Sequence, residues 1–146
     1  MDSLETLIAI EEIKRLKADY FDLVDSKRWE DWGNLFVEDC VAEFVDEPPG
    51  FTVTCRSELI DLVSEGLKDA LTIHRGDNPR IDIVSPTEAK GVWAMQDWLH
   101  WPEGVPLPQG VRNMKGWGHY TETYRKTKEG WRFVTLRLTR QLLKKY

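Results

Sequence analysis

Apolar residues recur at spacings of three to five positions from Ser3 to about Val24, which is the pattern of one buried face of an α-helix. We therefore predict a helix over this segment, with the Ser3 hydroxyl capping its first turn. A second, shorter helix is expected after Ser26, packed against the first as a helical hairpin. Its apolar stripe would comprise Trp29, Trp32, Leu35 and Phe36.

The periodicity of the chain then changes twice. Two short runs rich in Val, Phe and Thr flank the turn sequence "DEPPG", so a β-hairpin is predicted over "VAEFVDEPPGFTVTC". Helical spacing returns in "SELIDLVSEGLKDA", behind another serine cap, with an inward stripe of Leu59, Ile60, Val63 and Leu67. From Leu71 onward the pattern is that of strands, expected over residues 71–75, 79–84, 89–101, 111–126 and 131–142.

This order of elements indicates an α+β fold, in which a curved antiparallel sheet forms a cone around N-terminal helices. The length of 146 residues is that of one domain, which we expect to span residues 1–146. Where long strands bend away from the helices, the space between the two layers can form an apolar pocket of ligand size. A small-molecule site in the cone is therefore expected.

Composition and charge exclude several other classes of protein. The net charge of -5 argues against nonspecific nucleic-acid binding. No apolar run is long enough for a membrane helix, and the acidic start is unlike a secretory signal, so we expect a cytoplasmic protein without nucleic-acid or membrane partners. Residues 1–50 hold 14 acidic and 5 basic side chains, whereas residues 111–146 hold 2 and 10. Acidic helices and basic strands that share one fold would explain this difference, and an anionic ligand is the alternative.

The two cysteines, Cys40 and Cys55, are too few for a disulfide framework and lack the spacing of a zinc site. We expect both to be reduced core residues and predict no metal site.

One carboxylate stands in an unfavourable place. Asp25 ends the first predicted helix, directly after Leu23 and Val24. The unpaired carbonyl groups at a helix C-terminus carry partial negative charge and disfavour an acidic side chain. Asp25 therefore needs a partner, which is either the amide groups of the second helix, as a cap, or a group elsewhere in the fold.

Four segments carry a resemblance to a known family: "IEEIKRLKADYFDLVDSKRW", "IHRGDNPRIDI", "GVWAMQDWL" and "GHYTETYRKTKEGWRF". Over about residues 3 to 142 the chain resembles the SnoaL-like branch of the nuclear-transport-factor-2-like superfamily, whose fold is a cystatin-like α+β barrel. It is most similar there to bile-acid 7α-dehydratase, and more distantly to scytalone dehydratase and hexachlorocyclohexane dehydrochlorinase. The resemblance implies removal of water or hydrogen chloride by a His–Asp pair, with no metal or organic cofactor.

The same resemblance implies four catalytic residues. Asp25 and His74 match the acid–base pair, in which the carboxylate orients the imidazole and leaves its second nitrogen free as a base. Tyr20 and Arg140 match a tyrosine and an arginine that hold or polarise the reacting oxygen. Arg140 also stands on a strand face with Val134, Leu136 and Leu138, where alternation expects an apolar side chain, so it needs an acidic partner or a ligand oxygen. Asp77 stands where the family often has a second histidine, which leaves the substrate open.

Further residues are expected to contact the substrate because they lie on strands that line the cone. These candidates are Trp93, Met95, Trp117, His119 and His100. The loop "PEGVPLPQG" is long for a hairpin and stiffened by prolines, so it is either a pocket lid or an oligomer contact.

We therefore expect a dehydratase that acts on a hydrophobic cyclic hydroxy ketone. The alternatives are a ketosteroid-type isomerase, which would use the same base, and a non-catalytic binding or assembly module, in which Asp25 and His74 would not meet in an enclosed pocket. An aromatic sheet face also suggests a homotrimer, as in the similar lyases, with a homodimer as the alternative.

Overall fold

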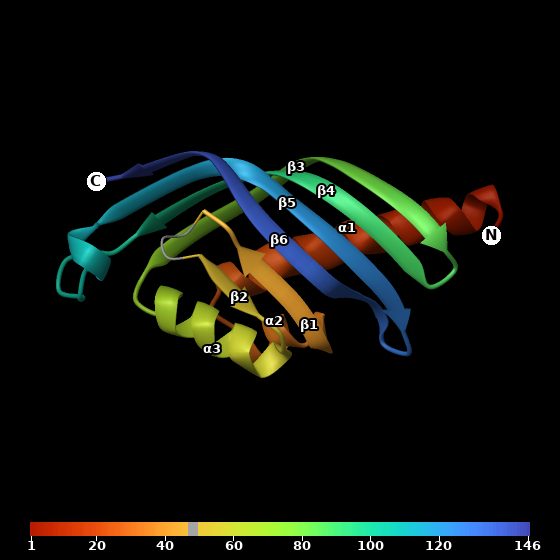
Figure 1. Cartoon of the computed structure of the whole chain (residues 1–146), viewed down its shortest axis with the longest axis horizontal. Helices are drawn as coiled ribbons and strands as arrows, with labels where there is room; N and C mark the ends of the chain where they lie inside the picture. The colour runs from red at the N-terminus through yellow and green to blue at the C-terminus, as the bar shows by residue number, and fades with distance from the viewer. Residues whose placement is uncertain (47–49) are drawn as a thin grey trace.

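The computed structural model describes residues 1–46 and 50–146, which form three α-helices and one six-stranded sheet (Figure 1). The helices are α1 (Ser3–Asp25), α2 (Trp29–Gly33) and α3 (Arg56–Leu67). The strands are β1 (Phe36–Phe44), β2 (Phe51–Val53), β3 (Leu71–Ser85), β4 (Glu88–His100), β5 (Asn113–Thr127) and β6 (Gly130–Lys145), and a short 3-10 helix, η1 (Pro108–Gly110), precedes β5. The predicted α+β class is confirmed.

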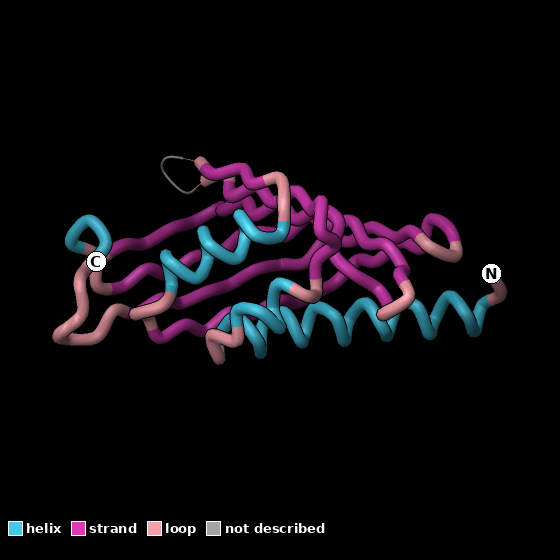
Figure 2. Tube along the Cα trace, turned by 90° about the horizontal axis from the view of Figure 1, so that it is seen from below, coloured by secondary structure: helices cyan, strands magenta, loops and turns pink. Residues whose placement is uncertain are grey.

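The sheet has the order β2-β1-β6-β5-β4-β3. Neighbouring strands run antiparallel except β1 and β6, which run parallel. The expectation of a wholly antiparallel sheet is therefore wrong at this pair. Residues 47–49, in the middle of the predicted "DEPPG" turn, lie outside the described residues, but β1 and β2 pair as the predicted hairpin. The sheet curves over the helices, which lie together on its concave side (Figure 2).

Helix α1 crosses the concave face and buries one side against it. Asp2, rather than the predicted Ser3, caps its first turn: the Asp2 carboxylate accepts from the Glu5 N–H at 2.8 Å, and the Glu5 carboxylate accepts from the Asp2 N–H. The apolar stripe is buried from Ala9 to Val24. The three residues before it, Leu4, Leu7 and Ile8, are exposed, because the N-terminal end of the helix extends beyond the sheet (Figure 1).

The second and third helices differ from the prediction at their ends. Helix α2 stops at Gly33, and Phe36 opens β1 instead of completing a helical stripe. An added Cβ at Gly33 would lie 2.3 Å from the Ile60 side chain, so this glycine allows α2 to approach α3 closely. Helix α3 has Cys55 at its N-cap without a side-chain hydrogen bond, so the predicted serine cap is not formed. Cys40 is a buried free thiol as expected, but Cys55 is only half-buried.

The long strands are more continuous than predicted. The runs 71–75 and 79–84 form one strand, β3, in which Asn78 and Pro79 form a bulge and Asn78 has a φ of 50°. A second register shift lies between Phe133 and Thr135, so Phe133 is fully buried and Val134 is only partly so. The predicted inward face of β6 therefore holds for Leu136, Leu138 and Arg140 but not for Val134.

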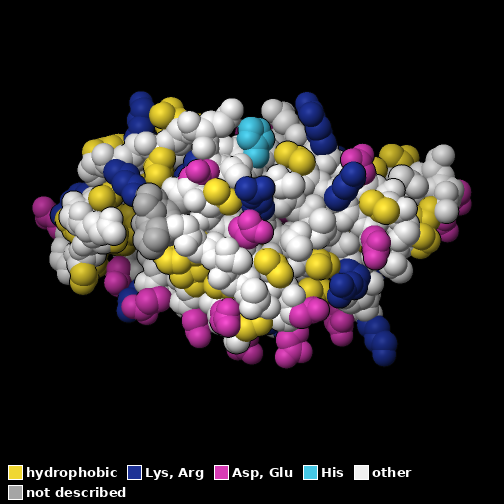
Figure 3. All heavy atoms as spheres, in the orientation of Figure 1, with side chains coloured by type: hydrophobic (Ala, Val, Ile, Leu, Met, Phe, Trp, Pro, Cys, Tyr) yellow, Lys and Arg dark blue, Asp and Glu magenta, His cyan; other side chains and the backbone are white. Residues whose placement is uncertain are grey.

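The two charge-rich ends of the chain occupy different parts of the molecule. Acidic side chains gather along the edge formed by α2, α3 and β1, and most basic side chains in this view lie over the strands (Figure 3). Within the described part of the chain, no helix is both long and apolar enough to cross a bilayer.

Candidate active site

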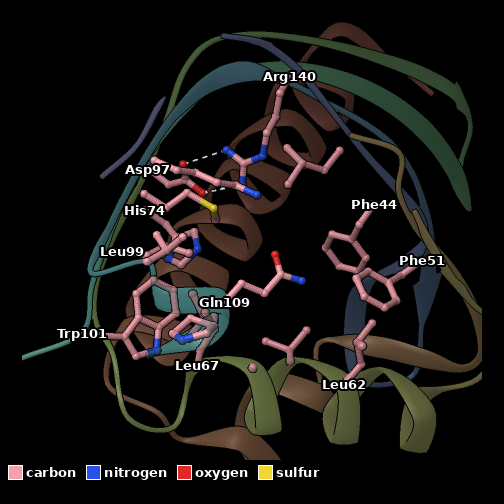
Figure 4. A pocket seen from close by; sticks show the side chains of 18 of the residues that line it. Phe44, Phe51, Leu62, Leu67, His74, Asp97, Leu99, Trp101, Gln109 and Arg140 are labelled. Atoms are coloured by element: carbon pink, nitrogen blue, oxygen red, sulfur yellow. Dashed lines mark hydrogen bonds and ion pairs between the residues drawn. The ribbon is translucent and has the colours of Figure 1, made fainter. Parts of the chain in front are cut away.

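A cavity of about 330 Å³ lies between the concave face of the sheet and helix α3 (Figure 4). One wall is apolar and includes Phe44, Phe51, Leu62 and Leu67, whereas the opposite wall carries His74, Asp97 and Arg140 (Figure 4). The other lining residues are Tyr20, Val24, Val63, Gly66, Leu99, Trp101, Pro108, Gln109, Val111, Met114, Tyr120, Leu138 and Lys145. A hydrophobic ring could pack on the first wall while a polar substituent meets the second.

The last residue of α1 contacts the strand that runs beside it. The Oδ1 atom of Asp25 lies 2.6 Å from Nδ1 of His74, and its Oδ2 atom accepts from the His74 backbone N–H at 3.0 Å. The Thr72 hydroxyl donates to Oδ1 at 2.8 Å. Three hydrogen bonds from β3 thus hold the carboxylate that the helix end disfavours. Asp25 does not cap α2, whose N-cap is Arg28 without a side-chain bond.

These contacts define the protonation of the pair. Partial burial works against ionisation of Asp25, but hydrogen bonds and the positive charge of His74, together with the Thr72 bond, hold the pKa of Asp25 below its ordinary value. A carboxylate can only accept, so Nδ1 of His74 carries the proton that it shares with Asp25. In the tautomer that is protonated on Nδ1, the lone pair of the ring is on Nε2. Because His74 lines the cavity and its side chain is only 10% exposed, this lone pair is available to a bound molecule rather than to bulk water.

Arg140 has the acidic partner that its inward position requires. Its Nη1 and Nη2 atoms donate to the two carboxylate oxygens of Asp97, each at 2.9 Å, and both side chains are almost fully buried. The backbone N–H of Arg140 also donates to Asp46 at 2.6 Å. Sequence reasoning missed Asp97, although it stands between the inward-facing Met95 and Leu99, where alternation marks it in the same way as Arg140.

Two tyrosines lie beside this polar wall. Tyr20, which was expected at the site, is buried and lines the cavity. Tyr120, which was not predicted, is also buried and lines the cavity. Their rings meet edge to face at a centroid distance of 5.9 Å. Burial raises the pKa of both hydroxyls, and nearby carboxylates, including Asp97, act in the same direction. Both phenols are therefore neutral hydrogen-bond donors near pH 7.

The five residues expected to contact the substrate lie outside the cavity lining. Trp93 and Met95 face inward but are packed in the core, where the Trp93 indole donates to the Tyr124 hydroxyl at 3.1 Å. The other three, Trp117, His119 and His100, are on the outer face of the sheet. Successive side chains of a strand point to opposite faces of the sheet. The inward positions of β5 are Met114, Gly116, Gly118 and Tyr120, so Trp117 and His119 point outward.

The proline-containing loop before β5 contributes Pro108 and Gln109 to the cavity, and Gln109 adopts a φ of 53° at the end of η1 (Figure 4). This position agrees with the expected lid more than with an oligomer contact. Within the described ranges, no group of three or more His, Cys, Asp or Glu side chains could hold a metal ion.

Comparisons with known proteins place this geometry in context. A family model described as SnoaL-like domain matches residues 5–137. "Probable cyclase FGR4" from Gibberella zeae is 26% identical over 137 residues, which is 88% of each chain. The structure of "Putative Scytalone Dehydratase" from Novosphingobium aromaticivorans has a TM-score of 0.85 and 25% identity, covering 99% of this chain and 92% of that one.

Two further structures support the fold. A hexachlorocyclohexane dehydrochlorinase, LinA type 2, has a TM-score of 0.80 at 22% identity and covers 99% of this chain and 93% of its own. A protein from Novosphingobium aromaticivorans, described as NTF2-like with a cystatin-like fold, has a TM-score of 0.75 at 22% identity, covering 94% and 85%. The expected SnoaL-like family and cystatin-like fold are therefore confirmed.

Proposed function

Because this chain belongs to the SnoaL-like family, we propose that it is a cofactor-independent lyase that removes water from a hydrophobic cyclic hydroxy ketone. The observation that carries the proposal is the 2.6 Å contact of Asp25 with His74 at the wall of a largely apolar cavity. An imidazole oriented in this way can act as a general base toward a bound molecule.

The reaction would run as follows. Nε2 of His74 takes a proton from the carbon beside the ketone, and the electron pair of that C–H bond moves toward the ketone oxygen. Asp25 stabilises the imidazolium that results. The electron pair then returns to form the carbon–carbon double bond as the C–O bond to the hydroxyl breaks, and His74 gives its proton to the departing oxygen. The products are an unsaturated ketone and water, so protons and electrons balance.

The negative charge that develops on the ketone oxygen needs donors. The hydrogen-bonded pair of Tyr20 and Tyr120 lines the cavity and can donate to this oxygen, and the guanidinium of Arg140, held in place by Asp97, lies on the same wall. In comparable sites one such donor contributes roughly 3 to 4 kcal/mol to the transition state. The apolar wall excludes water and strengthens these interactions.

The relatives favour the same chemical class. One is a probable cyclase and another a dehydratase by description, and both cover nearly the whole chain. A non-catalytic module is less well supported, because Asp25 and His74 do meet, and among residues 1–46 and 50–146 no bulky side chain fills the cavity. An isomerase, which would use the same base to move a proton between carbons, differs from a dehydratase only in its product.

The proposal can be tested by incubating the protein with hydroxy steroids and polyketide ring ketones, and following the ultraviolet absorbance of the new conjugated ketone. Mass spectrometry separates the two reactions, because dehydration lowers the product mass by one water and isomerisation leaves it unchanged. His74→Ala should lose activity by about a hundredfold or more. His100→Ala, which changes a histidine on the outer face, is the matched control and should stay active. Full turnover by folded His74→Ala would exclude His74 as the base.

We also propose that the protein is a homotrimer, with a homodimer as the alternative, joined through the outer face of the sheet. Trp98 and Ile73 are paired neighbours there, each 42% exposed, and Leu142 is 48% exposed. Light scattering after size-exclusion chromatography should give the trimer mass, and Trp98→Glu should shift it toward the monomer. Val84→Glu, at the far end of β3, is the control. A monomeric wild-type protein at micromolar concentration would overturn this proposal.

A further inference from the structure

The core contains an ion pair that the proposed reaction does not use. Nζ of Lys17, from α1, lies 2.5 Å from Oε2 of Glu122, from β5, and neither side chain has any exposed surface. The other carboxylate oxygen of Glu122 accepts from the Tyr124 hydroxyl at 2.7 Å, and Tyr124 accepts in turn from the Trp93 indole. The network thus links the Lys17 ammonium of α1 to residues of two strands, β4 and β5.

The ammonium of Lys17 is also enclosed by aromatic rings. It lies 3.5 Å from the ring centroid of Tyr120 and 3.9 Å from that of Tyr20, which are close cation–π contacts. The rings of Phe21 and Phe133 lie farther away, at 5.0 and 5.3 Å. The two nearest rings are the same two tyrosines that line the cavity.

Stability alone does not explain a charged residue at this position. Lys17 stands on the buried face of α1 with Ile13, Leu16 and Tyr20, where an apolar side chain of similar length would fit the pattern. Replacing a buried ion pair by apolar residues of similar volume is often neutral or stabilising. A buried pair kept at this point of the core therefore suggests a role in the neighbouring site.

The hydroxyl ends of both tyrosines are at the polar end of the cavity. Tyr20 and Tyr120 line the same cavity as His74, Asp97 and Arg140. Lys17 itself does not line the cavity. Its charge can therefore influence a bound molecule only through the two rings.

We propose that Lys17 is a positioning residue for the lyase reaction: its ammonium, held by Glu122, fixes and polarises the hydrogen-bonded pair of Tyr20 and Tyr120 so that this pair donates more strongly to the ketone oxygen. This inference rests on the proposed function, because it concerns the oxygen that becomes negative in that reaction. A positive charge against the face of a phenol ring draws electron density away from the hydroxyl oxygen and makes the O–H a stronger donor. Glu122 opposes this effect, but the ammonium lies directly against the rings.

A pair of probes can measure the donor strength without turnover. 2-Acetylnaphthalene carries an acceptor carbonyl, and 2-isopropenylnaphthalene has the same shape with a CH₂ group in place of the oxygen. The ratio of their dissociation constants, together with the infrared stretching frequency of the bound carbonyl, reports the hydrogen bonds that the oxygen receives. We expect the wild-type protein to favour the ketone and to lower its carbonyl frequency.

The variant Lys17→Met with Glu122→Leu removes both charges and keeps the core filled. The preference for the ketone should fall about fivefold, which is the difference between a charge-assisted and an ordinary hydrogen bond, and the carbonyl band should move to higher frequency. Ile13→Val, a core change in the same helix that removes no charge, is the control and should leave the ratio and the band unchanged. Equal loss of affinity for both probes, with an unmoved band, would show a purely structural role and overturn the proposal.

A measurement on the unaltered protein makes the test independent of how the variant folds. Burial lowers the pKa of Lys17 to about 8, although Glu122 acts in the opposite direction, whereas Tyr20 and Tyr120 have raised pKa values and stay protonated. Raising the pH from about 7 to about 9.5 should therefore neutralise Lys17 and reduce the ketone preference of wild-type protein. A ratio that does not change with pH, or a wild-type protein with no preference for the ketone, would also overturn it. Absence of turnover with these effects intact would count against the lyase function alone.

Discussion

The glycine at position 116 provides a direct test of how the Arg140–Asp97 ion pair is accommodated in the polar wall of the cavity. Gly116 pairs with Asp97 across β4 and β5 and faces the cavity side of the sheet. A Cβ added there would lie 1.8 Å from Nη1 of Arg140 and 2.7 Å from Oδ1 of Asp97. We predict that Gly116→Ala separates part of the Arg140–Asp97 pair, because the guanidinium occupies the space that the methyl group needs.

The size of the effect follows from these distances. Ordinary contact begins near 3.4 Å, so Nη1 must move by about 3.4 − 1.8 = 1.6 Å, which breaks its 2.9 Å bond to Asp97. Loss of one buried charge-assisted hydrogen bond costs about 1.5–3 kcal/mol, and separation of the whole pair about 3–5 kcal/mol. Alanine regains about 0.5–1 kcal/mol of conformational entropy. The net loss in the free energy of unfolding should therefore lie between about 1 and 4 kcal/mol.

Urea denaturation measures this loss as a lower midpoint with an unchanged slope. Gly66→Ala is the matched control, because Gly66 lies in helix α3 and an added Cβ meets nothing within 4 Å. That control should gain about 0.5–1 kcal/mol. In a background that lacks both charged side chains, Arg140→Ala with Asp97→Ala, the Gly116→Ala change should no longer destabilise. A Gly116→Ala protein with the wild-type midpoint would refute the assignment of this glycine to the ion pair.

Two further predictions concern Asp25 and the start of α1. The pKa of Asp25 is lowered in the folded state, so its stabilising contribution is present above its ordinary pKa of about 4 and is lost as the pH falls through the folded-state value. Asp25→Asn should therefore be less stable than wild type at pH 7, and acid titration followed by circular dichroism should show the two proteins converging below about pH 4. Asp2→Ala should lower the free energy of unfolding by about 1 kcal/mol because it removes the cap, whereas Ser3→Ala should be nearly neutral in the same urea assay, and equal effects would contradict the capping box.

The pair of Asp25 and His74 illustrates how much the local sequence pattern can predict. The amphipathic pattern of the first helix ends at Asp25, and a carboxylate at a helix C-terminus needs a partner. The sequence therefore predicted that Asp25 makes a contact. The resemblance of the "IHRGD" segment supplied His74 as that partner. Their contact is present in the structure, together with a third member, Thr72, for which the sequence held no signal. Whether the pair acts as a base stays a prediction.

The predicted substrate contacts show where the pattern stops. Alternation along β5 predicts that Trp117 and His119 share one face, and they do. Which face lines the cavity depends on the side of the sheet that α1 covers, and on bulges that change the parity of a strand, such as the shift at Val134. Neither is encoded in a local spacing, so these residues were assigned to the wrong face.

Local periodicity was enough to predict most of the elements, their order, the α+β class and which residues of a strand share a face, because each depends on spacing within a few residues. The tertiary structure alone decided which polar groups pair across the core. Asp97 meets Arg140, and Lys17 meets Glu122, over separations of 43 and 105 residues, through strand register and the crossing of α1 over the sheet. Such contacts depend on the relative placement of whole elements, which no local spacing contains.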